Sequence, residues 1–139
     1  MWLTYAFLSA LFAALTAILA KIGIKDVDSN LATAIRTVVI LIFAVGIVLF
    51  QGSYKQLSAV SRYTFIFLIL SGIATGLSWL FYFRALQLGE ASRVAPIDKL
   101  SLVFTIILAF VILKEKITFS VILGSILMTA GAIIIAVVK

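Results

Sequence analysis

The sequence predicts an all-α integral membrane protein in which five transmembrane helices form a bundle. First, 65% of the 139 residues are hydrophobic and only 12% are charged, a composition foreign to soluble domains. Second, the chain divides into five apolar segments, each close to the roughly 20 residues that a helix needs to cross a hydrocarbon core. Third, these segments show no period-2 alternation, which favours helices over the strands of a membrane barrel.

Short polar connectors separate the predicted spans, which lie at 2–20, 31–50, 64–84, 92–113 and 119–138. The connectors read KIGIKDVDSN, QGSYKQLSAVSRY, QLGEA and KEKIT. Because they are short, consecutive helices should pack as antiparallel neighbours in one domain, residues 1–139. No small-residue cleavage site follows the first span, so we expect a retained helix and a multi-pass protein of the cytoplasmic (inner) membrane, in contact with its lipid.

The residue types exclude most enzyme chemistry. The sequence has no cysteine and no histidine, so it offers no disulfide, no thiolate or imidazole metal site and no Ser-His or Cys-His nucleophile. We therefore expect no enzyme activity, no cofactor and no metal. The net charge of +6 comes from basic residues scattered at segment ends rather than gathered in a patch, which argues against a nucleic-acid partner.

Small residues indicate faces where helices approach closely in lipid. Gly72 and Gly76 form a GxxxG pattern in the third span, and Gly124 and Gly131 lie one heptad apart in the fifth. GxxxG also occurs by chance in apolar helices. Packing within the chain and dimerisation therefore both remain open interpretations of these faces.

An odd number of spans places the two termini on opposite sides of the membrane. The side with the amino terminus, side A, and the opposite side B carry similar numbers of basic residues, so the positive-inside rule gives almost no bias. We expect the chain to insert in both orientations and to form an antiparallel homodimer, an inverted repeat made of two polypeptides. The alternative is a partner that fixes one orientation. Side A has Lys55, Arg62, Lys114 and Lys116; side B has Lys21, Lys25, Arg84, Arg93 and Lys139.

Charged residues inside the spans lie near side B. Arg36 and Asp98 are both predicted about 8–9 Å below that side, and Lys99 is one residue deeper. Neighbouring residues on a helix point about 100° apart, so Asp98 and Lys99 should each need another partner. Three interpretations follow: an Arg36–Asp98 bridge with Lys99 reaching the interface, a basic vestibule for an anionic group, or Asp98 as a proton carrier. Pairing with arginine favours ionised Asp98 and so disfavours the third.

Aromatic residues near the end of the third span are candidate substrate contacts. Trp79 and Tyr82 share a face with Gly72 and Gly76, where they could wall a cavity. The same residue types also form the interfacial belt of membrane proteins, so both roles stay open. Pro96, the only proline, is expected in the first turn of the fourth helix, where it removes no helical hydrogen bond.

The run FYFRALQLGEASRVAPI, followed by LKEKITFSVILGSILMTAGAIII, resembles the second half of an EamA domain of the drug/metabolite transporter superfamily. The resemblance covers essentially the whole chain and departs at three places. Leu102 stands where the family usually has a proline, Lys114 where it has a glycine, and Asp98 and Lys99 where it commonly has small or hydroxyl residues. The matching positions are Tyr82, Ala85, Leu86, Ser92, Glu115, Gly124 and Gly131, together with Arg36 early in the second span.

Most members of that family carry two mutually inverted domains and export amino acids or other metabolites. The resemblance therefore implies a dimeric, exporter-like transporter of a small polar or anionic metabolite, working by alternating access. The competing hypothesis is a non-transporting membrane subunit of a hetero-oligomeric transporter or lipid-carrier flippase complex. In that case the GxxxG faces would serve hetero-assembly.

Overall fold

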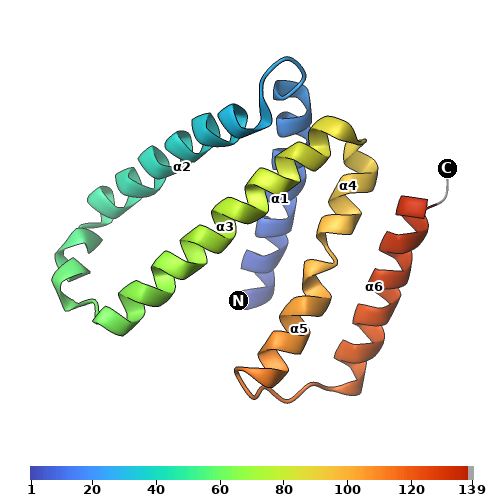
Figure 1. Cartoon of the computed structure of the whole chain (residues 1–139). Helices are drawn as coiled ribbons and strands as arrows, with labels where there is room; N and C mark the ends of the chain where they lie inside the picture. The colour runs from blue at the N-terminus through green and yellow to red at the C-terminus, as the bar shows by residue number, and fades with distance from the viewer. Residues whose placement is uncertain (138–139) are drawn as a thin grey trace. The chain divides into compact units, whose positions relative to one another are not determined.

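The computed structural model describes residues 1–137, and no strand occurs among them. Four helices and the α4–α5 stretch are long and apolar enough to cross a membrane, which confirms the all-helical fold class. The predicted span end at Val138, and Lys139 of the charge tally, lie outside the described residues. The elements in Figure 1 are α1 (Trp2–Gly23), α2 (Ser29–Gln51), the 3-10 helix η1 (Ser53–Ala59), α3 (Arg62–Leu88), α4 (Ala91–Asp98), α5 (Ser101–Val111) and α6 (Phe119–Val137).

The connectors differ from the prediction at two places. The α2–α3 connector contains η1, which begins after Gly52, a residue in the left-handed conformation (φ +69°) that ends α2. The expected QLGEA connector is wrong, because α3 continues to Leu88 and only Gly89 and Glu90 separate it from α4. Arg84 consequently lies one turn inside α3 rather than at its end.

The chain forms two compact units, each described by itself. Unit 1 comprises residues 1–18 and 88–139, and unit 2 comprises residues 19–87. In unit 1, α4 and α5 both pack against α6. Unit 2 contains the end of α1 and the antiparallel helices α2 and α3, which η1 connects (Figure 1).

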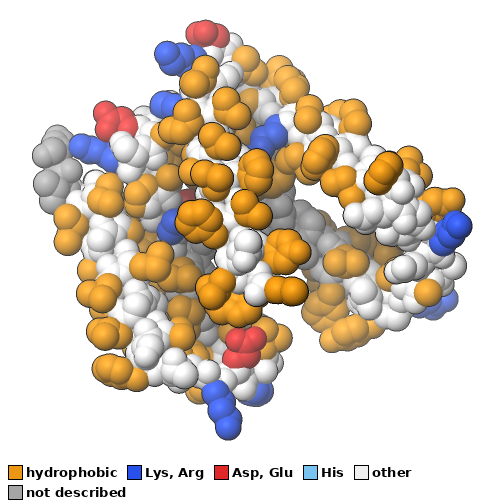
Figure 2. Space-filling view, turned by 180° about the vertical axis from the view of Figure 1, so that it is seen from behind, with side chains coloured by type: hydrophobic (Ala, Val, Ile, Leu, Met, Phe, Trp, Pro, Cys, Tyr) orange, Lys and Arg blue, Asp and Glu red, His pale blue; other side chains and the backbone are white. Residues whose placement is uncertain are grey.

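Few side chains are buried, and exposed apolar side chains are spread over the whole face shown in Figure 2. Helices that are apolar all round and remain exposed are typical of a surface solvated by lipid or covered by other chains. The buried residues among 1–137 are Ala17, Ile24, Ser29, Thr33, Phe83, Leu86 and Ala132.

The predicted fourth span is not one continuous helix. α4 ends at Asp98 and α5 starts at Ser101, and the amides of Lys99 and Leu100 donate to carbonyls three residues earlier, Pro96 and Ile97. Pro96 lies inside α4 rather than in its first turn, so that expectation is wrong. Proline has no N–H to donate to the carbonyl of Ser92, four residues before it, so it removes one hydrogen bond from α4 itself. Bonds to carbonyls three residues earlier tighten the backbone at the break that follows.

The glycines expected at helix contacts have open space beside them. A Cβ atom added at Gly72, Gly76, Gly124 or Gly131 would meet no heavy atom within 4 Å outside its own helix backbone. Their role in helix packing stays a prediction, and these faces have room for lipid or for another chain.

Candidate functional site

The inner face of α2 in unit 2 is polar. Ser29, Thr33 and Arg36 are spaced i, i+4 and i+7, which places them on one face of the helix. Ser29 and Thr33 are buried, and Arg36 is half-buried. The Thr33 hydroxyl donates to the Ser29 carbonyl at 2.8 Å, so this buried polar group is satisfied within its own helix.

Arg36 contacts an aromatic face of α3. The guanidinium carbon lies 4.2 Å from the ring centroid of Trp79 and 5.2 Å from that of Phe83. Both distances are within the range of cation–π attraction, for which tryptophan is the strongest partner. The Tyr82 ring adjoins Phe83 edge-on, with centroids 6.5 Å apart. The structure thus brings together three predicted site residues, Arg36, Trp79 and Tyr82.

No carboxylate of the same unit neutralises Arg36. The only acids in residues 19–87 are Asp26 and Asp28, and both lie in the α1–α2 connector. The ion pairs found among residues 1–137 join Arg93 to Glu90 and Lys99 to Asp98, all four in unit 1. The rings around Arg36 stabilise the cation without cancelling its charge, so an anionic group remains favourable beside it.

The two remaining predicted site residues pair with each other. Lys99 Nζ lies 3.3 Å from Asp98 Oδ2, so the expectation that neither could satisfy the other is wrong. A regular helix would point the two side chains apart, but Lys99 follows the last residue of α4 and lies in the break between α4 and α5. The predicted Arg36–Asp98 bridge joins residues of different units and stays a prediction. No group of three His, Cys, Asp or Glu side chains that could hold a metal occurs in the described part of the chain.

A polar anchor that the sequence did not reveal fixes one end of unit 2. Lys21 Nζ donates to the Leu86 carbonyl at 2.6 Å, and Gln87 Nε2 donates to the Val27 carbonyl at 3.0 Å. Ile24 and Leu86, with 1% and 0% of their surface exposed, are the apolar centre of the same region. These bonds tie the last turn of α1 and the α1–α2 connector to the last turn of α3. The one sequence signal was a glutamine just beyond the predicted end of the third span.

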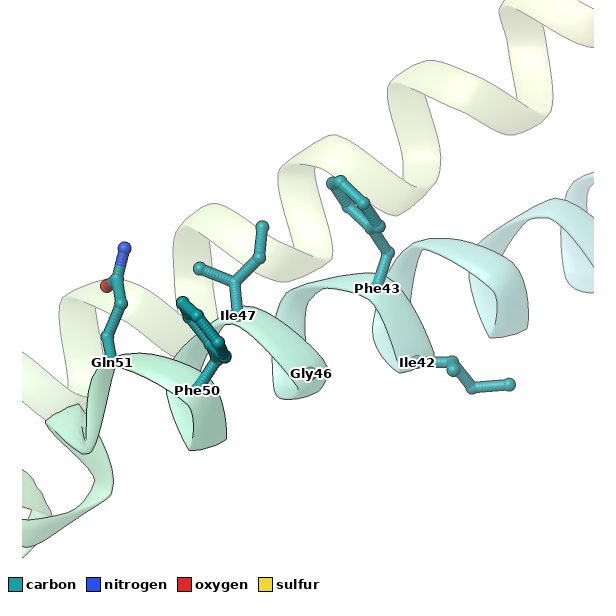
Figure 3. A pocket seen from close by; sticks show the side chains of 6 residues that line it. All are labelled: Ile42, Phe43, Gly46, Ile47, Phe50 and Gln51. Carbon is teal, nitrogen blue, oxygen red and sulfur yellow. The ribbon is translucent and has the colours of Figure 1, made fainter.

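Two of the hollows in unit 2 differ in their lining. The first, of about 540 Å³, is lined by α2 alone, where Gly46 has no side chain beside Phe43, Ile47 and Phe50, and Ile42 projects away from them (Figure 3). It lacks charged groups and is typical of a lipid-facing notch. The second, of about 460 Å³, lies between the start of α2 and the second half of α3. It is lined by Asp28, Ser29, Asn30, Leu77, Leu80, Phe81 and Arg84.

Comparison with known proteins identifies the family of this chain. Residues 1–137 match the model of the EamA-like transporter family. A protein of Sinorhizobium sp named "Uncharacterized transporter in cobO 3'region" is 50% identical over 136 residues, which cover 98% of this chain and 96% of that protein. No solved structure matches the chain.

Proposed function

Because the chain belongs to the EamA-like transporter family, we propose that it exports a small polar or anionic metabolite across the cytoplasmic membrane, by alternating access in an antiparallel homodimer. The observation that carries the proposal is Arg36, a cation on the membrane-spanning helix α2 whose unit has no carboxylate in its spans. A charge within a membrane helix costs up to about 2.5–3.5 kcal/mol on insertion scales, the upper value applying at the helix centre. Such residues usually face a substrate pathway.

The contacts of Arg36 suit an anion better than a cation. Trp79 and Phe83 hold the guanidinium by their ring faces, while Ser29 and Thr33 extend the polar surface along α2. A guanidinium stacked on a ring keeps its N–H donors at the rim, where a carboxylate or phosphate can accept two of them. We propose that Arg36 binds the anionic group of the metabolite and that Trp79 and Tyr82 contact the rest.

Two observations support the homodimer: the balance of basic residues between the two sides of the membrane and the exposure of the helix faces. The two sides of the membrane carry similar numbers of basic residues, which permits both orientations. At most 6% of the residues in any span's most apolar window are buried within the chain. The open faces at Gly72, Gly76, Gly124 and Gly131 allow close approach of a second copy.

Transport is tested in proteoliposomes loaded with a panel of carboxylates, phosphates, amino acids and neutral metabolites. We expect efflux above that of empty vesicles for at least one anionic substrate. Arg36→Met should reduce that efflux at least tenfold, whereas Lys55→Met, a cation in η1, should leave it unchanged. Efflux equal to that of empty vesicles across the panel would contradict the transport proposal, and selective efflux of neutral metabolites would contradict the role of Arg36.

Orientation is tested with single cysteines, which the chain otherwise lacks. Ser58 in the α2–α3 connector and Asp26 in the α1–α2 connector are both exposed and lie at opposite ends of α2. An impermeant thiol reagent applied to intact cells should label each cysteine to about one half. Complete labelling of one and none of the other means a fixed topology, which refutes the antiparallel homodimer and favours an oppositely oriented partner protein.

A further inference from the structure

We propose that the groove between the start of α2 and the second half of α3 binds a phospholipid with a primary ammonium in its headgroup, such as phosphatidylethanolamine. In this assignment Arg84 binds the phosphate and Asp28 the ammonium. The proposal concerns a site that does not include Arg36 or Trp79, and it does not depend on the transport function. With a volume of about 460 Å³, the groove lies within the roughly 300–1,000 Å³ range of small-molecule sites.

The groove changes from charged to apolar along α3. Leu77, Leu80, Phe81 and Arg84 are spaced i, i+3, i+4 and i+7, so they form one face, and Leu77 lies about 10 Å along the helix axis from Arg84. Because α3 ends one turn after Arg84, the charged end lies where lipid headgroups lie, and the apolar end points into the hydrocarbon. This axis matches an amphiphile rather than a freely soluble ion.

Arg84 has donors left for a phosphate. Its side chain is exposed, and Nη1 donates to Gln87 Oε1 at 2.6 Å. That bond holds the guanidinium in place and leaves four of its five N–H groups outside this contact. The planar guanidinium fits the oxygens of a phosphate in a two-point contact.

Asp28 supplies the opposite charge at the same end of the groove. Its Oδ1 caps α2 by accepting from the amides of Asn30 at 2.9 Å and Leu31 at 3.1 Å, bonds that leave Oδ2 uninvolved. Neither ion pair found in residues 1–137 joins Asp28 to Arg84, so each charge can face a ligand. A primary ammonium donates hydrogen bonds to a carboxylate, whereas a choline headgroup has no N–H, and a purely anionic headgroup would be repelled by Asp28.

The test measures lipid retention by the full chain, purified in detergent and mixed with equal amounts of phosphatidylethanolamine, phosphatidylcholine and phosphatidylglycerol of the same acyl chains. Native mass spectrometry should find phosphatidylethanolamine retained about three- to fivefold more than phosphatidylcholine, as expected for one partly exposed ion pair. Asp28→Asn should reduce this ratio to about one. Asparagine caps helices as well as aspartate does, so the fold is preserved.

Two matched variants complete the experiment. Asp26→Asn removes an acid of the same connector that does not line the groove, and it should keep the wild-type ratio. Arg84→Gln should lower retention of all three lipids, with the detergent melting temperature confirming that it folds. Equal retention of all three lipids by the wild type, a preference for phosphatidylglycerol, or an unchanged ratio in Asp28→Asn would each overturn the proposal. Soluble phosphoethanolamine that displaces the lipid completely at equal concentration would do so as well, because the apolar face would then contribute nothing.

Discussion

The contact between Arg36 and Trp79 yields a quantitative prediction about the free energy of unfolding. Cation–π pairs contribute about 0.5–1 kcal/mol when exposed and about 2 kcal/mol when desolvated. Arg36 is half-buried and lies 4.2 Å from the Trp79 centroid, so we expect about 1–1.5 kcal/mol for this pair. The Phe83 ring is 5.2 Å away and is the weaker type of partner, so about 0.5 kcal/mol is expected there.

A double-mutant cycle isolates this energy from the other effects of each substitution. The variants are Arg36→Met, Trp79→Leu and the double variant, unfolded by denaturing detergent in mixed micelles. Arg36→Met alone should be neutral or stabilising, because it removes a charge that no carboxylate of its unit neutralises. Trp79→Leu should lower the free energy of unfolding by about 1–1.5 kcal/mol less in the Arg36→Met variant than in the wild type.

The control cycle pairs Arg36→Met with Phe43→Leu. Phe43 lies two turns further along α2 and is 71% exposed, about 10 Å from Arg36 along the helix axis. The free-energy changes of substitutions at distant sites are additive within about 0.3–0.5 kcal/mol, and this value sets the detection limit of the cycle. A coupling below that limit for Trp79 would refute the interpretation that the aromatic face of α3 stabilises the arginine in the membrane.

Three further changes test other parts of the structure. Lys114 has φ +57°, in the left-handed region that favours glycine, so Lys114→Gly should raise the free energy of unfolding by about 0.5–1 kcal/mol. Lys116→Gly, outside that region, should not stabilise. Lys21→Met leaves the Leu86 carbonyl without its charged donor, and faster amide exchange in the last turn of α3 should report a loss of about 1.5–3 kcal/mol. Pro96→Ala restores an N–H that can donate to the Ser92 carbonyl and should slow amide exchange within α4; unchanged exchange there would mean that proline does not weaken this helix.

Hydrophobic pattern was sufficient to predict the membrane helices. Every predicted span boundary that falls within residues 1–137 lies within four residues of the observed one, because in lipid each helix satisfies its own backbone and must match the thickness of the bilayer. The hydrophobic pattern did not predict the break after Pro96. Residues 91–111 are apolar enough on average to be predicted as one span, and hydropathy carries no information about which carbonyl an amide bonds to.

The site was only partly predictable, for a different physical reason. Arg36 and Trp79 stand out because charges and tryptophans are rare in spans, and the structure places them together. Lys21 and Gln87 looked like ordinary interfacial residues. Their partners are backbone carbonyls 65 and 60 positions away, and a backbone acceptor leaves no mark in the sequence.

The anchor and the arginine contact together explain how α2 and α3 keep one register. Between apolar helices in lipid there is little hydrophobic force to select a register, so polar contacts must do so. Gln87 holds the connector that begins α2, and Arg36, about two turns into that helix, then meets Trp79, about two turns before Gln87 on antiparallel α3. Because Arg36 and Trp79 lie at similar distances from the anchor on antiparallel helices, the register that the anchor sets also permits their contact. A slip of one residue would rotate Arg36 by about 100°, off the aromatic face and toward lipid, at the cost of an unsolvated charge.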